Sequence, residues 1–281
     1  MSNLSKLSSE EIKNLEDKAL KIRSHILNMI TNAASGHPGG SLSAVELLTT
    51  LYFTQMKVDP QNPSDPNRDR FVLSKGHASP VLYSVLAERG FFDPKDLMTF
   101  RKIGTCLQGH PDMVKLKGVD MSTGSLGQGL SVACGMAISG KLDKKDYQVY
   151  ALLGDGELQE GQVWEAAMFA SHYKLDNLTI IVDNNGLQID GEITDVLSPL
   201  PIPEKFQAFG WETLIIDGHN YNEIYEAINK SKTIKDKPTA IIAKTVKGKG
   251  VSCMENKASW HGKAPSLEEC KAFLEEIGGA K

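Results

Sequence analysis

The sequence predicts an α/β fold, a doubly wound and mostly parallel sheet with helices on both faces. Short apolar runs typical of buried strands occur at residues 149–153, 178–182 and 239–243, and segments with apolar side chains at helical spacing separate them. The chain has 281 residues, 41% of them hydrophobic, which is enough to bury a large core. Because the sequence has no internal repeat and no convincing linker, residues 1–281 are expected to form a single domain.

Two helices are expected in the first part of the chain. Residues 9–33 predict a packing helix, because apolar side chains recur there at roughly helical spacing and two serines precede them as N-cap candidates. Ser43 and Glu46 have the spacing of a capping box, which predicts a second helix that runs through Leu51 or beyond.

A short strand is expected at residues 71–73, followed by a turn that contains glycine and histidine and then by a new helix. Gly90 and Gly104 are expected to end helices, and Asp93 with the following proline to begin a short helix between them. Beyond the central part of the chain, the expected elements are a strand at 211–217, a helix at 221–228, a strand at 238–244 and a helix at 267–277.

Composition argues against several classes of protein. The net charge is −4, with the two signs interspersed and no basic block, so no nucleic-acid or anionic-membrane surface is expected. The four cysteines are widely spaced and form no CxxC pair, which favours a reducing compartment, by default the cytoplasm. No apolar run approaches the length that spans a bilayer, and the N-terminus lacks an apolar leader core, so a soluble, unprocessed chain is expected.

The centre of the chain combines two predicted strands with two polar clusters, Gly154-Asp155-Gly156 and Asp183-Asn184-Asn185-Gly186. A helix between the strands makes them parallel, and parallel strands bring both clusters to one edge of the sheet. Aspartate and asparagine offer the oxygen ligands that suit Mg²⁺, and the glycines allow close approach of an anion. The two clusters together predict a magnesium diphosphate site, although an aspartate between two glycines is by itself more often a turn.

Three histidines lie in loops rich in glycine and proline: His37, His77 and His110. His77 precedes a predicted helix, where an anion would be stabilised. A fourth loop, residues 123–129, is rich in glycine and leads into a helix. Each loop has a structural alternative, namely a capped turn, a solvated strand end or close helix packing. Three histidine loops in one chain are harder to explain in this way than one.

Eight motifs occur here in the order seen in the N-terminal part of transketolases, which depend on thiamine diphosphate: SGHPGG, SKGHASP, QGHPD, TGSLGQG, GDGELQEG, DNNG, KTVKGKG and WHGKAP. The chain resembles this family from about residue 10 to about residue 265. The resemblance implies the thiamine diphosphate-binding fold, with residues 1–281 as a single diphosphate-binding domain.

The resemblance also assigns roles to individual residues. The implied metal ligands, for Mg²⁺ or else Ca²⁺ or Mn²⁺, are Asp155, Asn185 and the backbone carbonyl of Leu187. The implied cofactor-binding residues are His77, Gly124, Ser125, Leu126, Gly156, Asn185, Lys244 and His261. The histidines implied to face the donor sugar and the thiazolium are His37, His110 and His261.

Transketolases move a two-carbon ketol unit from a ketose phosphate to an aldose phosphate. Both halves of the reaction need proton transfer near neutral pH, which suits imidazole, while thiamine diphosphate supplies the electron sink. Two other functions stay open. A subunit acting on another ketose or a 2-oxo acid is one, although the sugar-facing histidines fit an oxo acid poorly. The other is a non-catalytic partner that only binds the cofactor, but such a protein would not need His37, His110 and His261.

The chain departs from the full-length family by stopping where the pyrimidine-binding half should begin. In the family that half supplies the glutamate that activates the aminopyrimidine and the arginines that hold the sugar phosphate. Glu160 and Glu165 match residues placed at the subunit contact and cannot take that glutamate's task. The chain therefore resembles the N-terminal subunit of a split transketolase. Its expected partner is a C-terminal subunit with the pyrimidine-binding and C-terminal domains, in an assembly with two copies of each chain.

Overall fold

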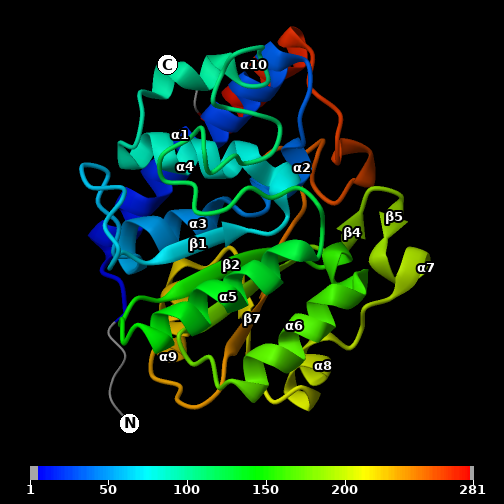
Figure 1. Cartoon of the computed structure of the whole chain (residues 1–281). Coiled ribbons are helices and arrows are strands. Elements are labelled where there is room, and N and C mark those ends of the chain that lie inside the picture. The colour runs from blue at the N-terminus through cyan, green and yellow to red at the C-terminus, as the bar shows by residue number, and fades with distance from the viewer. Residues whose placement is uncertain (1–5, 279–281) are drawn as a thin grey trace.

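The computed structural model describes residues 6–278 and contains a five-stranded, wholly parallel sheet (Figure 1). In spatial order its strands are β1 (Arg70–Leu73), β2 (Val149–Gly154), β3 (Leu178–Asn184), β7 (Thr239–Lys244) and β6 (Glu212–Asp217). A separate antiparallel pair is formed by β4 (Leu187–Gln188) and β5 (Gly191–Glu192). The predicted α/β class with a mostly parallel sheet is confirmed.

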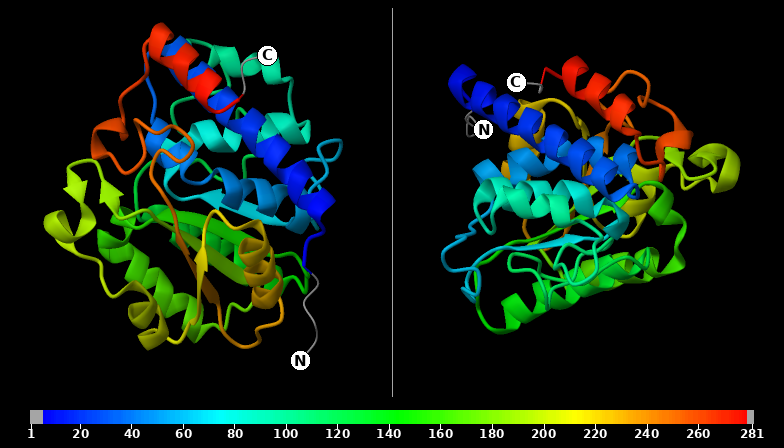
Figure 2. Two further views of the ribbon diagram at one scale, coloured as in Figure 1. Left: turned by 180° about the vertical axis from the view of Figure 1, so that it is seen from behind. Right: turned by 90° about the horizontal axis from the view of Figure 1, so that it is seen from above.

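Helices cover both faces of the sheet (Figures 1 and 2). One face is covered by α1 (Ser9–Ala33), α2 (Pro38–Leu42), α3 (Val45–Thr50), α4 (Ser79–Arg89), α9 (Tyr221–Ser231) and α10 (Leu267–Glu276). The other face is covered by α5 (Gln128–Leu142), α6 (Gly161–His172) and α8 (Ile202–Ala208). Figure 2 shows α10 lying along α1. The short helix α7 (Ile193–Leu197) follows β5.

The two cores follow from the alternation of side chains along the strands. Tyr150 and Leu152 of β2 point into the core under α1, α3 and α4, whereas Val149, Ala151 and Leu153 point into the core under α5 and α6. All five side chains are buried, which explains why this strand reads as a continuous apolar run instead of an alternating one.

The first predicted helix is confirmed, with a capping box at its start. The Oγ atom of Ser8 accepts a hydrogen bond from the backbone N–H of Glu11 at 3.2 Å, and the Glu11 carboxylate accepts one from the N–H of Ser8 at 2.8 Å. The helix ends at Ala33, and the next residue, Ala34, caps it in a left-handed conformation with φ of 48°.

The predicted capping box at Ser43 and Glu46 is wrong. Helix α3 begins after Ala44 without a side-chain cap, although it does continue through a π-helical turn at Leu51–Gln55. The Ser43 hydroxyl instead donates to Asp183 at 2.6 Å, and the Glu46 carboxylate pairs with distant side chains. Buried charged partners outcompete the local cap for these two side chains.

The short helix expected to begin at Asp93 does begin there, but its expected end at Gly104 is wrong. The segment after Asp93 forms only a 3₁₀ helix, Pro94–Thr99, and Gly104 lies in a turn with φ of 83°. The expected elements after residue 210 are found within three residues of their predicted bounds. In the part of the chain that the structure describes, no helix is long and apolar enough to cross a bilayer.

Candidate active site

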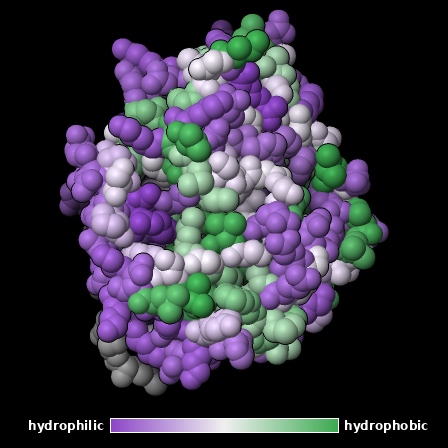
Figure 3. Space-filling view, viewed as in Figure 1, coloured by the Kyte–Doolittle hydropathy of each residue, from purple (hydrophilic) through white to green (hydrophobic). Residues whose placement is uncertain are grey.

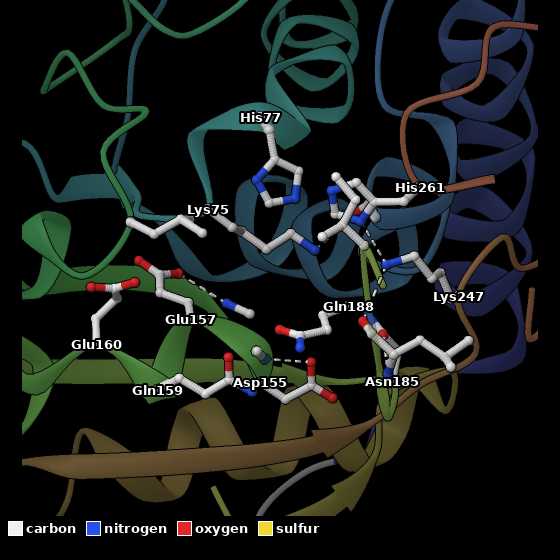
Figure 4. A pocket seen from close by; sticks show the side chains of 16 residues that line it. Lys75, His77, Asp155, Glu157, Gln159, Glu160, Asn185, Gln188, Lys247 and His261 are labelled. Atoms are coloured by element: carbon white, nitrogen blue, oxygen red, sulfur yellow. Dashed lines mark hydrogen bonds between the residues drawn. The ribbon is translucent and has the colours of Figure 1, made fainter. Parts of the chain in front are cut away.

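A cavity of about 280 Å³ opens beyond the carboxyl ends of β2 and β3 (Figure 4). This is the place where open parallel sheets bind ligands, because loops after several strands converge there. The cavity is lined by Gly40, Lys75, His77, Leu126, Gly154, Asp155, Gly156, Glu157, Gln159, Glu160, Asn185, Leu187, Gln188, Ile189, Lys247 and His261.

Asp155 follows directly after β2 and is 2% exposed. Its carboxylate accepts hydrogen bonds from the backbone N–H groups of Gly156, at 2.8 Å, and Gly186, at 2.5 Å. Burial, with the nearby negative charge of Asp183 adding to it, nevertheless raises the pKa of Asp155 to about 6. The two N–H groups therefore leave the negative charge only partly compensated, and a cation in the cavity would stabilise it.

Asp183, at the end of β3, lies beneath the cavity and is fully buried. It forms an ion pair with Lys75, and it also accepts hydrogen bonds from the hydroxyls of Ser43 and Thr245. Burial alone would raise the pKa of Asp183, but the charge and hydrogen bond of Lys75 outweigh it and lower the pKa. The amide of Asn185 donates to the same carboxylate at 3.4 Å, which fixes the orientation of Asn185.

Three histidine rings meet on the other side of the cavity. The ring centroids of His37 and His77 are 5.1 Å apart, those of His37 and His261 5.3 Å, and those of His77 and His261 5.1 Å. Burial lowers the pKa of His37 to about 4 and that of His261 to about 3, with Arg101 and Lys247 respectively as the largest charged contributors. The pKa of His77 is also lowered, by burial and by Lys75. All three are therefore neutral at pH 7.

Lys247 reaches into the cavity between the two groups and is 2% exposed. Its ammonium nitrogen lies 3.1 Å from the backbone oxygen of Leu187 and 3.0 Å from Nδ1 of His261. Burial and the positive charge of Lys75 lower the pKa of Lys247 to about 8, so it still carries its charge at pH 7. Because Lys247 donates to Nδ1, the neutral His261 ring carries its proton on Nε2 and can donate from there.

Glu157 organises the glycine-rich loop that closes one wall. Its buried carboxylate accepts hydrogen bonds from the backbone N–H groups of Gly127, at 3.0 Å, and Gly154, at 3.1 Å, and from the hydroxyl of Ser74. Gly124 in the same loop has φ of 143°, and a β carbon there would lie 2.9 Å from the His110 ring. A side chain at this position would therefore displace either the loop or the histidine.

The family model described as transketolase, thiamine diphosphate binding domain matches residues 16–280. The chain belongs to the transketolase family. It is 46% identical to the transketolase of Homo sapiens over 279 residues, which are 99% of this chain and 44% of that protein, so it spans less than half of such a relative. It is also 46% identical over 270 residues to the 6-deoxy-6-sulfo-D-fructose transketolase subunit SqwG of Clostridium sp. (strain MSTE9), covering 96% of this chain and 98% of that protein. A transketolase structure from Campylobacter jejuni superposes with a TM-score of 0.89 at 37% identity, covering 95% of this chain and 43% of that one.

Most residues singled out from the sequence meet in this transketolase domain. Those that line the cavity are His77, Leu126, Gly156, Asn185, Asp155, Leu187 and His261. His37 packs against two of them, as described above. Gly124 and His110 contact one another, but His110 is exposed, as is Ser125, and neither of these two residues lines the cavity.

Lys244 does not join this group. It is the last residue of β7, its side chain is exposed, and it does not line the cavity. The chain turns back after the strand, and the next lysine, Lys247, enters the cavity instead. We therefore replace Lys244 by Lys247 in the set of candidate cofactor-binding residues.

Sequence reasoning did not assign Lys75, Glu157 or Asp183 to the site. Lys75 stands two residues before His77, and Asp183 directly precedes the two asparagines, so both lay within motifs that had been singled out. In each case the sequence signal was a charged residue close to the end of an apolar strand. Burying such a charge without a partner is costly, so a partner for it could have been expected.

The residues present fit a metal diphosphate. Asp155 offers a partly uncompensated carboxylate, and the Leu187 carbonyl faces a cation, the ammonium of Lys247. Among residues 6–278, no group of three or more histidine, cysteine, aspartate or glutamate side chains could hold a metal by itself. A metal here would depend on ligands from a bound molecule, which is typical of Mg²⁺ with phosphate groups.

The buried histidines predict an acid-sensitive fold. Because the pKa values of His37, His77 and His261 lie below their usual value near 6.5, the unfolded chain binds more protons than the folded chain between about pH 6.5 and pH 4. The free energy of unfolding is therefore expected to fall as the pH is lowered through this range, partly offset by Asp155, whose raised pKa acts in the opposite direction.

Urea unfolding of the cofactor-free protein at several pH values measures this dependence. His37→Ala should flatten it, whereas His172→Ala, at an exposed site, should leave it unchanged. An equal pH dependence in wild type and His37→Ala would contradict the assignment of a buried, neutral His37.

Proposed function

We propose that this chain is the N-terminal, diphosphate-binding subunit of a split transketolase, which transfers a two-carbon ketol unit from a ketose phosphate to an aldose phosphate with thiamine diphosphate and Mg²⁺. The observation that carries the proposal is one cavity with oxygen ligands on one side and two neutral histidines, His77 and His261, on the other, with the neutral His37 packed against both. The Clostridium relative, which is matched over nearly its whole length, is named as a transketolase subunit, and this supports the split arrangement.

In this proposal Asp155, Asn185 and the Leu187 carbonyl hold the metal, which Ca²⁺ or Mn²⁺ can replace. The cofactor supplies the electron sink when it is bound. Asp183 holds the Asn185 amide in place, because it accepts a hydrogen bond from it. The glycine-rich loop, including Gly124, Ser125 and Leu126, is proposed to form the wall against the aminopyrimidine.

Two cations, Lys75 and Lys247, line the cavity and offset the charge of a diphosphate, but they are not equivalent. Lys75 is paired with the buried Asp183, whereas the Lys247 ammonium, among residues 6–278, forms hydrogen bonds only with neutral groups, the Leu187 carbonyl and the His261 ring. Lys247 is therefore the cation available to neutralise a diphosphate, together with His77 and the backbone of Gly156. The neutral His261 can donate from Nε2 to a sugar oxygen, and His37 and His110 are proposed to bind the sugar beside it.

The role of Lys247 is tested with a matched pair of lysine variants. We expect Lys247→Met to weaken thiamine diphosphate binding by about tenfold or more, because a charge-assisted hydrogen bond is lost. Lys244→Met, three residues earlier and exposed, should bind with wild-type affinity. Calorimetric titration of the chain with its partner decides this, and the reverse order of the two affinities would restore Lys244 to the site.

The catalytic role of the histidines is tested separately from cofactor binding. His110→Ala is expected to retain cofactor affinity, since His110 does not line the cavity. Both His110→Ala and His261→Ala are expected to lower kcat by on the order of 100-fold, because one group that transfers a proton or binds a hydroxyl is removed. Steady-state kinetics with a panel of ketose phosphates measures kcat and KM for each variant. Wild-type rates in both variants would show that these loops are structural.

A further inference from the structure

Lys247 enters the cavity on the loop of residues 245–250, and two side chains that do not line the cavity form hydrogen bonds with the backbone of this loop. The backbone N–H of Val246 donates to Nε2 of His219 at 2.9 Å. The backbone oxygen of Lys249 accepts from Nε of Arg23 at 3.1 Å. These two hydrogen bonds flank Lys247 on both sides in the sequence, and neither His219 nor Arg23 lines the cavity.

A single carboxylate joins the two side chains. Glu46 accepts a hydrogen bond from His219 Nδ1 at 2.9 Å through one oxygen and pairs with Arg23 through the other. The side chains of Arg23, Glu46 and His219 are 10%, 9% and 15% exposed, so the network is largely shielded from water. Burying an ion pair is costly unless its hydrogen bonds are complete. Any other arrangement of these side chains would leave a buried charge without a partner, so the network favours one geometry.

The hydrogen bonds define the state of His219. Nε2 accepts from a backbone N–H and therefore carries no proton, so Nδ1 carries the proton and donates to Glu46. The backbone of His219 is held as well, because its backbone N–H donates to the Asp217 carboxylate at 2.8 Å. His219 thus connects the end of β6 to the loop that follows β7.

The loop is also shaped to receive Arg23. Gly250 has φ of 96°, and a β carbon at this position would lie 2.9 Å from Nε of Arg23. The absence of a side chain therefore allows the guanidinium to approach the loop backbone. The N–H of Gly248 also donates to the oxygen of Gly39, the residue before the cavity-lining Gly40, at 3.0 Å, which gives the loop a third tie to the rest of the fold.

We propose that Arg23, Glu46 and His219 are positioning residues, which hold the 245–250 loop so that the Lys247 ammonium stays in the cavity ready for a diphosphate. The proposal rests on the proposed function of Lys247. It assigns the preorganisation of the cofactor site to a network built from α1, α3 and the segment after β6, none of which carries Lys247 itself. Preorganised groups cost less to order when the ligand binds, so loosening the loop should weaken binding.

Two substitutions at His219 separate positioning from general stability. In His219→Asn the amide nitrogen takes the place of Nδ1 and can still donate to Glu46, but the side chain is too short to reach Val246. In His219→Gln the amide oxygen takes the place of Nε2 and can accept from Val246, while the contact with Glu46 is lost. We expect His219→Asn to weaken thiamine diphosphate binding by about tenfold or more and His219→Gln to stay within about threefold of wild type.

The first measurement is calorimetric titration of thiamine diphosphate, with Mg²⁺, into the chain assembled with its partner. Urea unfolding of both variants should give similar midpoints, because each variant loses one hydrogen bond of the network. Equal weakening in the two variants, or wild-type affinity in His219→Asn, would overturn the inference.

The second measurement needs no ligand, so its outcome is independent of the proposed function. Hydrogen exchange at the Val246 amide of the cofactor-free protein should be faster in His219→Asn than in His219→Gln and wild type. Equally slow exchange in all three would overturn the positioning role. If wild type itself fails to bind thiamine diphosphate, the proposed function is wrong, while the exchange rates still decide whether the network holds the loop.

Discussion

Replacing Asp155 by alanine is expected to abolish metal-dependent binding of thiamine diphosphate. Loss of a residue that merely supports a metal ligand already costs about 10- to 100-fold in affinity, so loss of a carboxylate ligand should cost at least about 100-fold. The structure gives a further reason to expect so large a loss of affinity. Burial raises the pKa of Asp155 to about 6, which means that its charge is poorly compensated until a cation arrives.

The fold of Asp155→Ala should survive, because the core on either side of β2 does not include this side chain. Calorimetric titration with thiamine diphosphate and Mg²⁺ measures the affinity, and urea unfolding without cofactor measures the stability. Asp190→Ala is a suitable control, since Asp190 is exposed in the neighbouring β4–β5 hairpin. Unchanged affinity in Asp155→Ala would remove Asp155 from the proposed metal site.

The parts of the fold that sequence reasoning predicted are those that local physics determines. Buried strands such as 149–153 and 178–182 need continuous apolar runs, and a helix between them requires parallel pairing. These two facts alone placed Asp155 and Asn185 at one edge of the sheet, where both line the same cavity.

Sequence reasoning failed where a side chain binds a partner far along the chain. Ser43 and Glu46 satisfy the spacing of a capping box, but Ser43 binds Asp183, 140 positions away, and Glu46 binds His219, 173 positions away. A local rule cannot weigh such partners, because they exist only once the tertiary fold has formed. The buried ion pair of Lys75 with Asp183, 108 positions away, escaped prediction for the same reason.

Loop geometry explains the remaining differences. The resemblance implies Lys244 as a cofactor-binding residue, but the loop after β7 turns back and delivers Lys247 to the cavity instead. The resemblance places His110 with His37 and His261, whereas its glycine and proline neighbours indicate a loop but not where the loop lies. In the structure His110 is exposed beside the Gly124 backbone.

The isolated chain is expected to show no ketol transfer, even when thiamine diphosphate and Mg²⁺ are saturating. The residues proposed for the diphosphate end of the cofactor are present here, but the carboxylate that activates the aminopyrimidine is expected from a partner polypeptide. Helices α5 and α6 and the segments before them are the expected contact surface, with Glu160 and Glu165 exposed for polar contacts. Figure 3 shows apolar residues on this face, and the exposed ones include Leu126, Met168, Phe169 and Tyr173.

The test is to purify the chain, assay it alone, and then add the candidate partner while following mass and activity together. Activity should appear only with a species that contains both chains, and two copies of each are expected. Met168→Glu, on α6, should prevent assembly because it buries a charge in the contact, whereas Leu267→Glu, at an exposed apolar residue on the opposite side of the sheet, should assemble normally. Robust ketol transfer by the isolated chain would overturn the split-enzyme proposal, and normal assembly of Met168→Glu would move the contact surface away from α6.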